Sequence, residues 1–318
     1  MPERLQVPKT YKLFIGGQFP RSESGRSMET LDRLTGLVAH VCRASRKDLR
    51  DAVVAARTAA EPWRLRDAYN RSQILYRLAE VMEGKRRELE EAIGTQAKAH
   101  STKHSAQTGN PKPESRIPNR RPQSAVRKTQ TPASEVSSSI DRVIAYAGWA
   151  DKFSQVLGCN NAVVGPYYNF TVAEGTGVCA VVAPDEPSLL GLVSLVAPPL
   201  CAGCSIVALA SETNPIPACI LAEAFATSDT PPGVVNILTG RRDELIPWIA
   251  EHRDIDCIHA AVASDEHSRM LRAGAGENLK RVHITPADTD WSNADDCESP
   301  RWIEPFVEFK TIWHPSGS

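Results

Sequence analysis

The sequence predicts an α/β fold with a doubly wound, Rossmann-like parallel sheet, and two observations support this prediction. Short apolar runs alternate with helical patterns between residues 178 and 285. The runs are apolar throughout, as is typical of strands that are covered by helices on both faces of a sheet. Because such sheets bind ligands at the carboxyl ends of their strands, we expect candidate site residues in the loops that follow the strands.

Residues 175–290 contain the repeating units of this Rossmann-like lobe. Strands are expected at 178–183, 205–210, 234–238, 256–262 and 282–285, and helices at 188–197, 216–227, 242–251 and 265–273. The apolar stretch at 187–211 is long enough to suggest a membrane span, but Pro198, Pro199 and Gly203 interrupt it. We therefore expect a buried helix, a turn and a buried strand there, and no membrane contact.

Residues 1–94 are expected to supply an N-terminal strand and helices to the same domain. The run LFIGGQF at 13–19 has the composition of a strand. A helix is predicted after Ser45 and is expected to end at Pro62-Trp63. A second amphipathic helix is predicted over 70–93, because its apolar residues form one stripe and its other face is heavily charged.

Residues 95–139 are expected to form a disordered, Ser/Pro-rich insertion. The segment has almost no large apolar residues, so it cannot bury enough surface to offset the entropy lost on ordering. Its charge is mainly positive, so contact with nucleic acid or acidic partners is an alternative. A solvated linker is favoured because no aromatic residues are interleaved with the basic ones.

The remaining segments are a helix and two pairing elements. A helix is expected at 140–157. A hairpin follows at 158–174, with its turn at Gly165-Pro166. Past Thr285 the chain is polar and prone to turns, and it ends in one strand within 303–318.

Composition limits the function classes. A formal net charge of -1 gives the molecule no electrostatic bias towards nucleic acid or anionic membranes. The first residues, MPERLQVPKTYK, have no apolar core, so we expect no signal peptide and a cytoplasmic location. Of the eight cysteines, all but Cys297 are expected to be buried free thiols, and the C-x-x-C of Cys201 and Cys204 to be structural. No metal site is expected, since the scattered histidines show no ligand spacing: His252, His259, His267 and His283.

Several motifs resemble segments of the aldehyde dehydrogenase superfamily. They occur in the family's order along the chain: FIGGQF (14–19), ETLDRLTG (29–36), DAVVAAR (51–57), YAGWADK (146–152), PPGVVNILTG (231–240) and VEFKTIWHP (307–315). Within the family, the chain resembles the degenerate second aldehyde dehydrogenase unit of the family-16 type, in truncated form. The resemblance implies that the hairpin at 158–174 and the strand at 303–318 are oligomerisation elements. It also implies that most of the catalytic lobe is missing.

The resemblance implies that the catalytic positions are not matched. The asparagine that would stabilise an oxyanion is replaced by Glu186, whose negative charge would repel the developing anion. The general-base glutamate is replaced by Thr285, and Pro286-Ala287-Asp288 stand where the family has a glycine pair. Cys297 is the only cysteine after Thr285. We expect it to be a surface thiol whose acidic neighbours raise its pKa, and therefore no catalytic nucleophile.

The cofactor positions that the resemblance implies are also mostly lost. Leu209 stands where a lysine would bind the ribose of a nicotinamide cofactor, and Val262 and His267 replace the two glycines of the phosphate loop. Glu212 retains the ribose-binding glutamate, and we interpret it as a vestigial contact.

These comparisons of residues predict a non-catalytic module that acts through oligomerisation, as a homo-oligomer or with a related aldehyde dehydrogenase subunit. Exposed strand edges would support such pairing. No cofactor is then expected. Two alternatives remain. The first is NAD(P)-dependent aldehyde oxidation, which family membership implies, and the second is a nucleotide-binding regulatory module. After Thr285 the chain passes almost directly to the C-terminal strand, without the missing part of the catalytic lobe. A splice variant, a fragment or a mispredicted gene would also explain this.

Overall fold

The centre of the computed structural model, which describes residues 9–32, 37–94, 130–262 and 264–316, is a five-stranded parallel sheet. The strand order is β10-β9-β6-β7-β8. The strands span Val178–Val182 (β6), Ser205–Leu209 (β7), Val235–Leu238 (β8), Cys257–Ala260 (β9) and Arg281–Ile284 (β10). The parallel sheet predicted from the alternating pattern is therefore confirmed.

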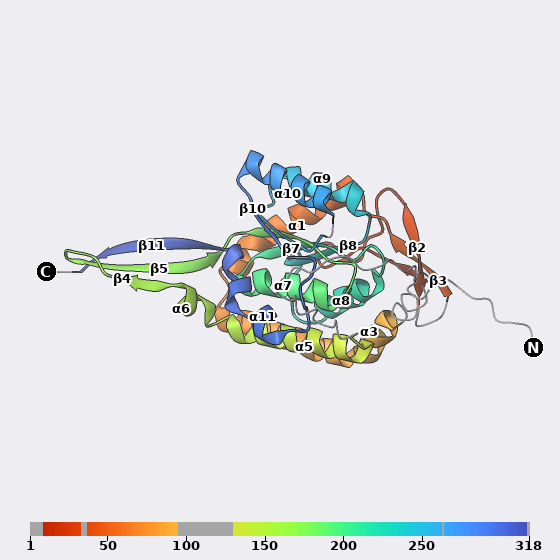
Figure 1. Ribbon diagram of the computed structural model, residues 1–318, viewed down its shortest axis with the longest axis horizontal. Coiled ribbons are helices and arrows are strands. Elements are labelled where there is room, and N and C mark those ends of the chain that lie inside the picture. The colour runs from red at the N-terminus through yellow and green to blue at the C-terminus, as the bar shows by residue number, and fades with distance from the viewer. Residues whose placement is uncertain (1–8, 33–36, 95–129, 263, 317–318) are drawn as a thin grey trace, which may run out of the picture.

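Helices cover both faces of this sheet (Figure 1). One face carries α1 (Arg46–Arg64), α9 (Arg242–Glu251) and α10 (Asp265–Asn278), and the other carries α7 (Leu190–Ala202) and α8 (Ile216–Ala226). The side chains of β6 alternate between two hydrophobic clusters. Val178, Ala180 and Val182 pack with α1, whereas Cys179 and Val181 pack with α7 and α8. Burial on both faces explains why this strand is apolar throughout.

The apolar run at 187–211 is divided between α7 and β7 by Gly203. This glycine has a φ of 97°, a left-handed conformation that ends α7. Residues with a Cβ atom rarely adopt this conformation. Within the described residues, no helix is long and apolar enough to span a membrane.

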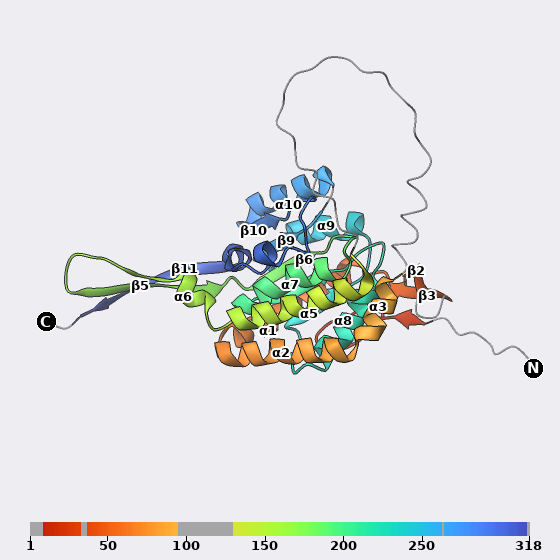
Figure 2. The same cartoon turned by 60° about the horizontal axis from the view of Figure 1, so that its bottom comes forward.

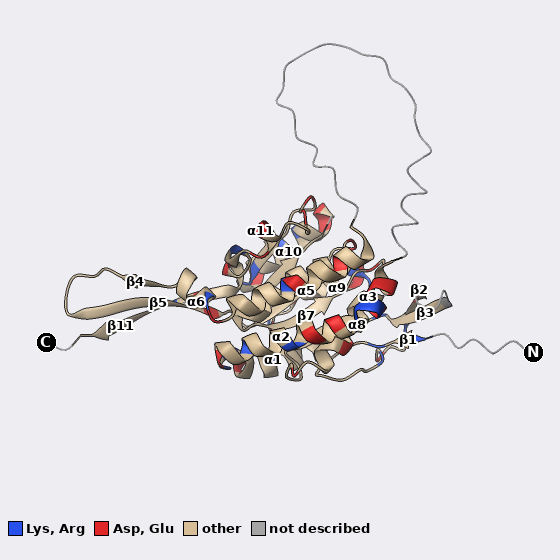
Figure 3. Ribbon diagram, turned by 90° about the horizontal axis from the view of Figure 1, so that it is seen from below, with Lys and Arg blue, Asp and Glu red and all other residues tan. Residues whose placement is uncertain are grey.

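Helices α2 (Ala68–Gly84), α3 (Arg86–Ile93) and α5 (Pro132–Trp149) form a further layer outside α7 and α8. Charged residues gather on α2 and α3 (Figure 3). The single helix predicted over 70–93 is thus wrong, because the chain breaks at Lys85. There the ammonium group reaches Glu223 of α8 at 2.8 Å and Glu88 at 3.0 Å, which fixes the junction between the two helices.

The expected boundaries around residue 140 are wrong. Helix α5 begins at Pro132 and ends at Trp149, and a short helix α6 (Phe153–Leu157) follows. Thr131 caps α5 by accepting a hydrogen bond from the backbone of Ser134. The polar composition of 132–139 conceals this helix, since its buried side includes Glu135 and Ser139. The rest of the expected insertion, 95–129, lies outside the described residues.

Two expectations for the N-terminal region also need correction. Pro62 lies inside α1, which continues to Arg64 because Trp63 is buried and its indole donates to the carbonyl of Leu200 at 3.1 Å. The run at 13–19 forms a tight turn through Gly16 and Gly17 and no strand. Its two isolated bridges join Ile15 to Gln18 across the turn and Phe14 to Ile237. The nearby small sheet consists of β1 (Thr10–Tyr11), β2 (Ser27–Asp32) and β3 (Leu37–Cys42).

A three-stranded ribbon extends from the body in both views and is called the arm here (Figures 1 and 2). It is built from β4 (Cys159–Asn161), β5 (Tyr167–Gly175) and β11 (Val307–Pro315), in the order β11-β5-β4. β11 pairs antiparallel with β5 along its whole length, from Val307 opposite Gly175 to Pro315 opposite Tyr167. Two segments that are distant in sequence therefore form one ribbon.

Candidate functional site

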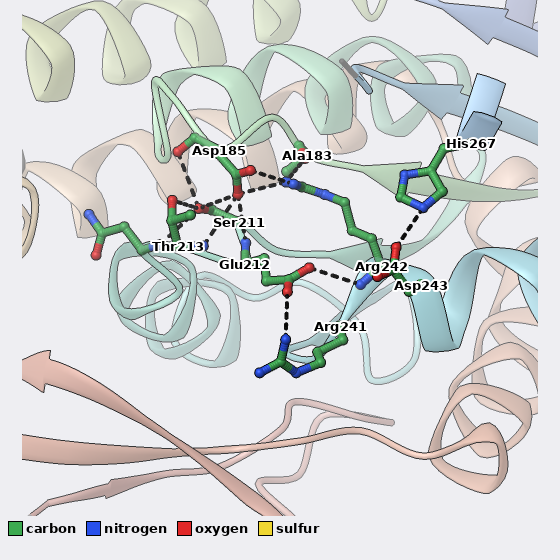
Figure 4. Close-up of polar contacts among 10 residues, drawn as sticks. Ala183, Asp185, Ser211, Glu212, Thr213, Arg241, Arg242, Asp243 and His267 are labelled. Atoms are coloured by element: carbon green, nitrogen blue, oxygen red, sulfur yellow. Dashed lines mark hydrogen bonds and ion pairs between the residues drawn. The ribbon is translucent and has the colours of Figure 1, made fainter. Parts of the chain in front are cut away.

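The carboxyl ends of β6, β7 and β8 meet at a polar cluster (Figure 4). Asp185 follows β6, Ser211 and Glu212 follow β7, and Arg242 begins α9 after β8. Parallel strands place their carboxyl ends at one edge of the sheet, which is why residues from three separate loops converge there. This edge is where a sheet of this type would hold a ligand.

An ion pair between Arg242 and Asp185 closes this edge. The guanidinium group donates from Nη1 to Oδ2 at 2.5 Å and from Nη2 to Oδ1 at 2.9 Å, and Nη2 also lies 2.8 Å from the carbonyl oxygen of Ala183. Burial acts to raise the pKa of Asp185, but the hydrogen bond and the charge of Arg242 outweigh it and lower that pKa below its ordinary value. Asp185 is therefore ionised at neutral pH.

Glu212 is engaged inside the protein. Its Oε2 accepts a hydrogen bond of 3.1 Å from the backbone amide of Arg242, at the first turn of α9. Its Oε1 lies 3.5 Å from Nη1 of Arg241, whose side chain is half exposed. The carboxylate that the resemblance assigns to a ribose thus caps the N-terminus of α9, where a negative charge is favourable.

The other cofactor positions do not fit a dinucleotide. The side chain of Leu209 is buried in β7 and offers no hydrogen-bonding group. Val262 is also buried and carries a branched side chain where a diphosphate would need close approach to the backbone. His267 binds Asp243 at 2.9 Å. Arg242 and Asp185 bind each other at the same edge, so these residues do not offer the donors that the resemblance implies for a dinucleotide.

The backbone amides at the start of α7 donate hydrogen bonds to a carboxylate of the protein itself. Oε1 of Glu135, which lies on α5, accepts hydrogen bonds from the backbone amides of Leu189 at 2.9 Å and Leu190 at 3.2 Å. Burial raises the pKa of Glu135, and the two backbone hydrogen bonds oppose that shift. Glu186, at the position of the oxyanion-binding asparagine, is exposed in the loop before this helix.

Thr285 lies against a buried histidine. Its hydroxyl oxygen is 3.4 Å from Nε2 of His259, whose Nδ1 lies 2.9 Å from the carbonyl oxygen of Leu195. This arrangement assigns the ring proton to Nδ1, which donates to the carbonyl. Burial lowers the pKa of His259 to about 3, so the ring is neutral and a weak base. No local pattern in the sequence places this histidine beside Thr285, which lies 26 positions later.

Cys297 is buried, so the prediction of a surface thiol is wrong. It ends the short helix α11 (Ala294–Cys297), its backbone carbonyl accepts a hydrogen bond from Tyr146 of α5, and its Sγ lies 3.6 Å from the carbonyl oxygen of Asp290. Its pKa is raised mainly by burial, with smaller contributions from Asp296 and Asp290, and Arg142 opposes the shift. A protonated, buried thiol is a poor nucleophile.

The other cysteines and the described histidines are scattered over the fold. Cys201 and Cys204 are buried free thiols, and Cys159 in the arm is exposed, contrary to expectation. In the part of the chain that the structure describes, no group of three or more histidine, cysteine or acidic side chains is placed to hold a metal ion.

Comparisons with known proteins agree with this architecture. The model of the aldehyde dehydrogenase family matches residues 19–108 and 124–285. Retinal dehydrogenase 2 of Gallus gallus is 33% identical over 285 residues, which cover 88% of this chain and 49% of that protein. The mitochondrial aldehyde dehydrogenase family 2 member B4 of Arabidopsis thaliana is 31% identical over 283 residues, which cover 88% and 47%.

Solved structures give the same result. The NAD⁺ complex of an aldehyde dehydrogenase from Bacillus cereus is similar with a TM-score of 0.70 and 26% identity, over 87% of this chain and 50% of that one. This chain therefore spans about half the length of the relatives that it matches. The matched family model covers most of the chain, the identity to curated relatives exceeds 30%, and the sheet superposes on solved members, so this chain belongs to the aldehyde dehydrogenase family.

Proposed function

We propose that this chain acts as a non-catalytic association module, pairing through its arm with a second copy or with a related aldehyde dehydrogenase subunit. The observation that supports this proposal is the arm itself. β11 forms one edge of the ribbon and pairs only with β5 among the described strands. An unpaired strand edge presents backbone amide and carbonyl groups that another strand can bind.

The side chains of the arm support association as well. Tyr167, Tyr168, Phe309, Ile312 and Trp313 are each more than 40% exposed. Residues 159–172 and 311–315 contain no Lys, Arg, Asp or Glu, as the uncharged far end of the arm in Figure 3 illustrates. A short ribbon with both faces in solvent has no core of its own and is marginally stable. A partner that covers it would remove this apolar surface from water.

The contacts at the carboxyl ends of the strands, and the burial of Cys297, support the non-catalytic part of the proposal. Arg242 and Asp185 are bound to each other, Thr285 faces a buried neutral histidine, and Cys297 is a buried thiol. None of these groups is arranged for the acid–base or nucleophilic chemistry that aldehyde oxidation requires. The likeness to a degenerate family-16 unit and the cytoplasmic location remain predictions.

Light scattering on the full chain over a micromolar concentration series tests the association. We expect a mass of at least twice the monomer at the upper end of the series, or a complex with a co-purified aldehyde dehydrogenase subunit. A monomer at every concentration, with no such subunit recovered, would overturn the proposal.

NAD(P)-dependent aldehyde oxidation is the second candidate function, and family membership supports it more directly than it supports a loss of activity. The test follows reduced cofactor after the chain is mixed with NAD or NADP and a panel of aldehydes. We expect no turnover above a protein-free control. Turnover that the substitution Cys297→Ala abolishes would establish the enzyme and reject the non-catalytic proposal.

A further inference from the structure

The carboxylate of Asp185 is surrounded by hydrogen-bond donors from two other loops. Arg242 donates to both of its oxygens, as described above. The backbone amides of Glu212 and Thr213 lie 3.0 Å and 3.3 Å from Oδ1, and the hydroxyl of Ser211 lies 3.3 Å from the same oxygen. Guanidinium groups and successive backbone amides are the donors that proteins use to bind phosphate and carboxylate ions.

We infer that these donors form an anion-binding site that the chain occupies with its own Asp185, and that removal of this side chain opens the site to a small external oxyanion. The ligand class is a phosphate or carboxylate group. The site is independent of the arm, because it lies at the carboxyl ends of β6, β7 and β8. It extends the proposed function by giving a reason why this lobe does not take a dinucleotide.

Arg242 is the residue that makes the site depend on an anion. Only 13% of its side chain is exposed, and its Nε is buried with no hydrogen-bond partner among the described residues. Without Asp185, its guanidinium group would keep the hydrogen bond to the backbone carbonyl oxygen of Ala183 but would have lost its carboxylate partner. A positive charge that is mostly buried and has lost its counter-ion is strongly unfavourable, so a free anion would bind there.

The nearby acidic side chains do not replace Asp185. Glu212 already accepts the amide of Arg242 and lies beside Arg241. Asp243, in the same turn of α9, is 87% exposed and binds His267. Asp185 is therefore the carboxylate that fills the site. Asp243 provides a matched control, because it is an aspartate of the same helix start that binds His267 and not Arg242.

Chemical rescue of Asp185→Ala tests this inference. The melting temperature is measured in increasing sodium phosphate and sodium formate, with sodium chloride at equal ionic strength as the reference. We expect the variant to be stabilised saturably by both oxyanions and to bind phosphate at least about tenfold more tightly than the wild type, the equivalent of one charge-assisted contact. The wild type and Asp243→Ala should respond to phosphate as they respond to chloride.

The double variant Asp185→Ala/Arg242→Ala should lose the response to oxyanions, because the guanidinium group is gone. If Asp185→Ala does not fold in chloride, refolding in phosphate should recover it. Asp185→Asn removes the charge but keeps an acceptor oxygen in the site, so in calorimetric titrations it should still bind phosphate more tightly than the wild type, although less tightly than Asp185→Ala does. Rescue that persists in the double variant, or an Asp185→Ala protein that responds to phosphate no more than the wild type does, would overturn the inference.

Discussion

The phenolic hydroxyl of Tyr146 donates a hydrogen bond of 2.8 Å to the backbone carbonyl of Cys297. This contact joins α5 to the segment that follows the sheet. Arg142, one turn earlier in α5, donates to the carbonyl of Trp291 at 3.0 Å and to the hydroxyl of Ser194 at 2.6 Å. The region past Thr285 is therefore packed against the body by specific contacts, although its sequence is polar and prone to turns.

Replacement of Tyr146 by Phe should destabilise the protein by about 1 kcal/mol, because a buried carbonyl loses its hydrogen-bond partner while the ring is kept. Urea denaturation of the two proteins measures this difference. Tyr76→Phe is the matched control, since Tyr76 is 45% exposed and should tolerate the change. Equal destabilisation by the two substitutions would argue against the contact.

The thiols should differ sharply in reactivity. Cys159 is exposed, whereas the other seven cysteines, Cys297 included, are buried. Mass spectrometry after a short exposure to a maleimide should find one modified cysteine in the native protein, and Cys159→Ser should remove that label. Labelling of Cys297 at a rate comparable with Cys159 would contradict its burial and would restore it as a candidate nucleophile.

Stability should fall as the pH is lowered from neutrality, in part because of His259. Its pKa in the folded protein is about 3, below the ordinary value of 6.5, so between these values the unfolded chain binds a proton that the folded chain does not. Linkage then removes roughly 2 kcal/mol from the free energy of unfolding between about pH 7 and pH 5.

Urea denaturation of His259→Gln over this range should give a shallower pH dependence than the wild type gives. His314→Gln, which changes an exposed histidine of the arm, should leave the wild-type dependence intact. An unchanged slope in His259→Gln would mean that other groups account for the acid sensitivity.

The sheet could be predicted from sequence because burial on both faces leaves a simple pattern. β6 and β7 are buried at every position, so their apolar runs are continuous. The first eight residues of α5 could not be found in this way. Glu135 binds backbone amides of α7, and Ser139 donates to the carbonyl of Glu135. Their polar side chains are compatible with burial only because these partners are present.

The candidate site depends on contacts that no local pattern contains. Arg242 and Asp185 are 57 positions apart and meet only because β6 and β8 end at the same edge of the sheet. The resemblance to the family identified which positions had changed, but not that Asp185 and Arg242 bind each other. Likewise, the acidic neighbours of Cys297 suggested solvent exposure, whereas the segment that carries Cys297 is bound to α5 and the thiol is buried.

The proposed role of the arm in association is tested most directly by comparing two substitutions that each introduce a negative charge. Trp313 is 59% exposed on β11, and Leu279 is 92% exposed at the end of α10, outside the strands of the arm. Sedimentation equilibrium should show that Trp313→Glu weakens association at least about tenfold, or by about 1.4 kcal/mol, whereas Leu279→Glu leaves it at the wild-type value. A wild-type protein that is monomeric and recovers no aldehyde dehydrogenase subunit, or equal effects of the two substitutions, would contradict the claim.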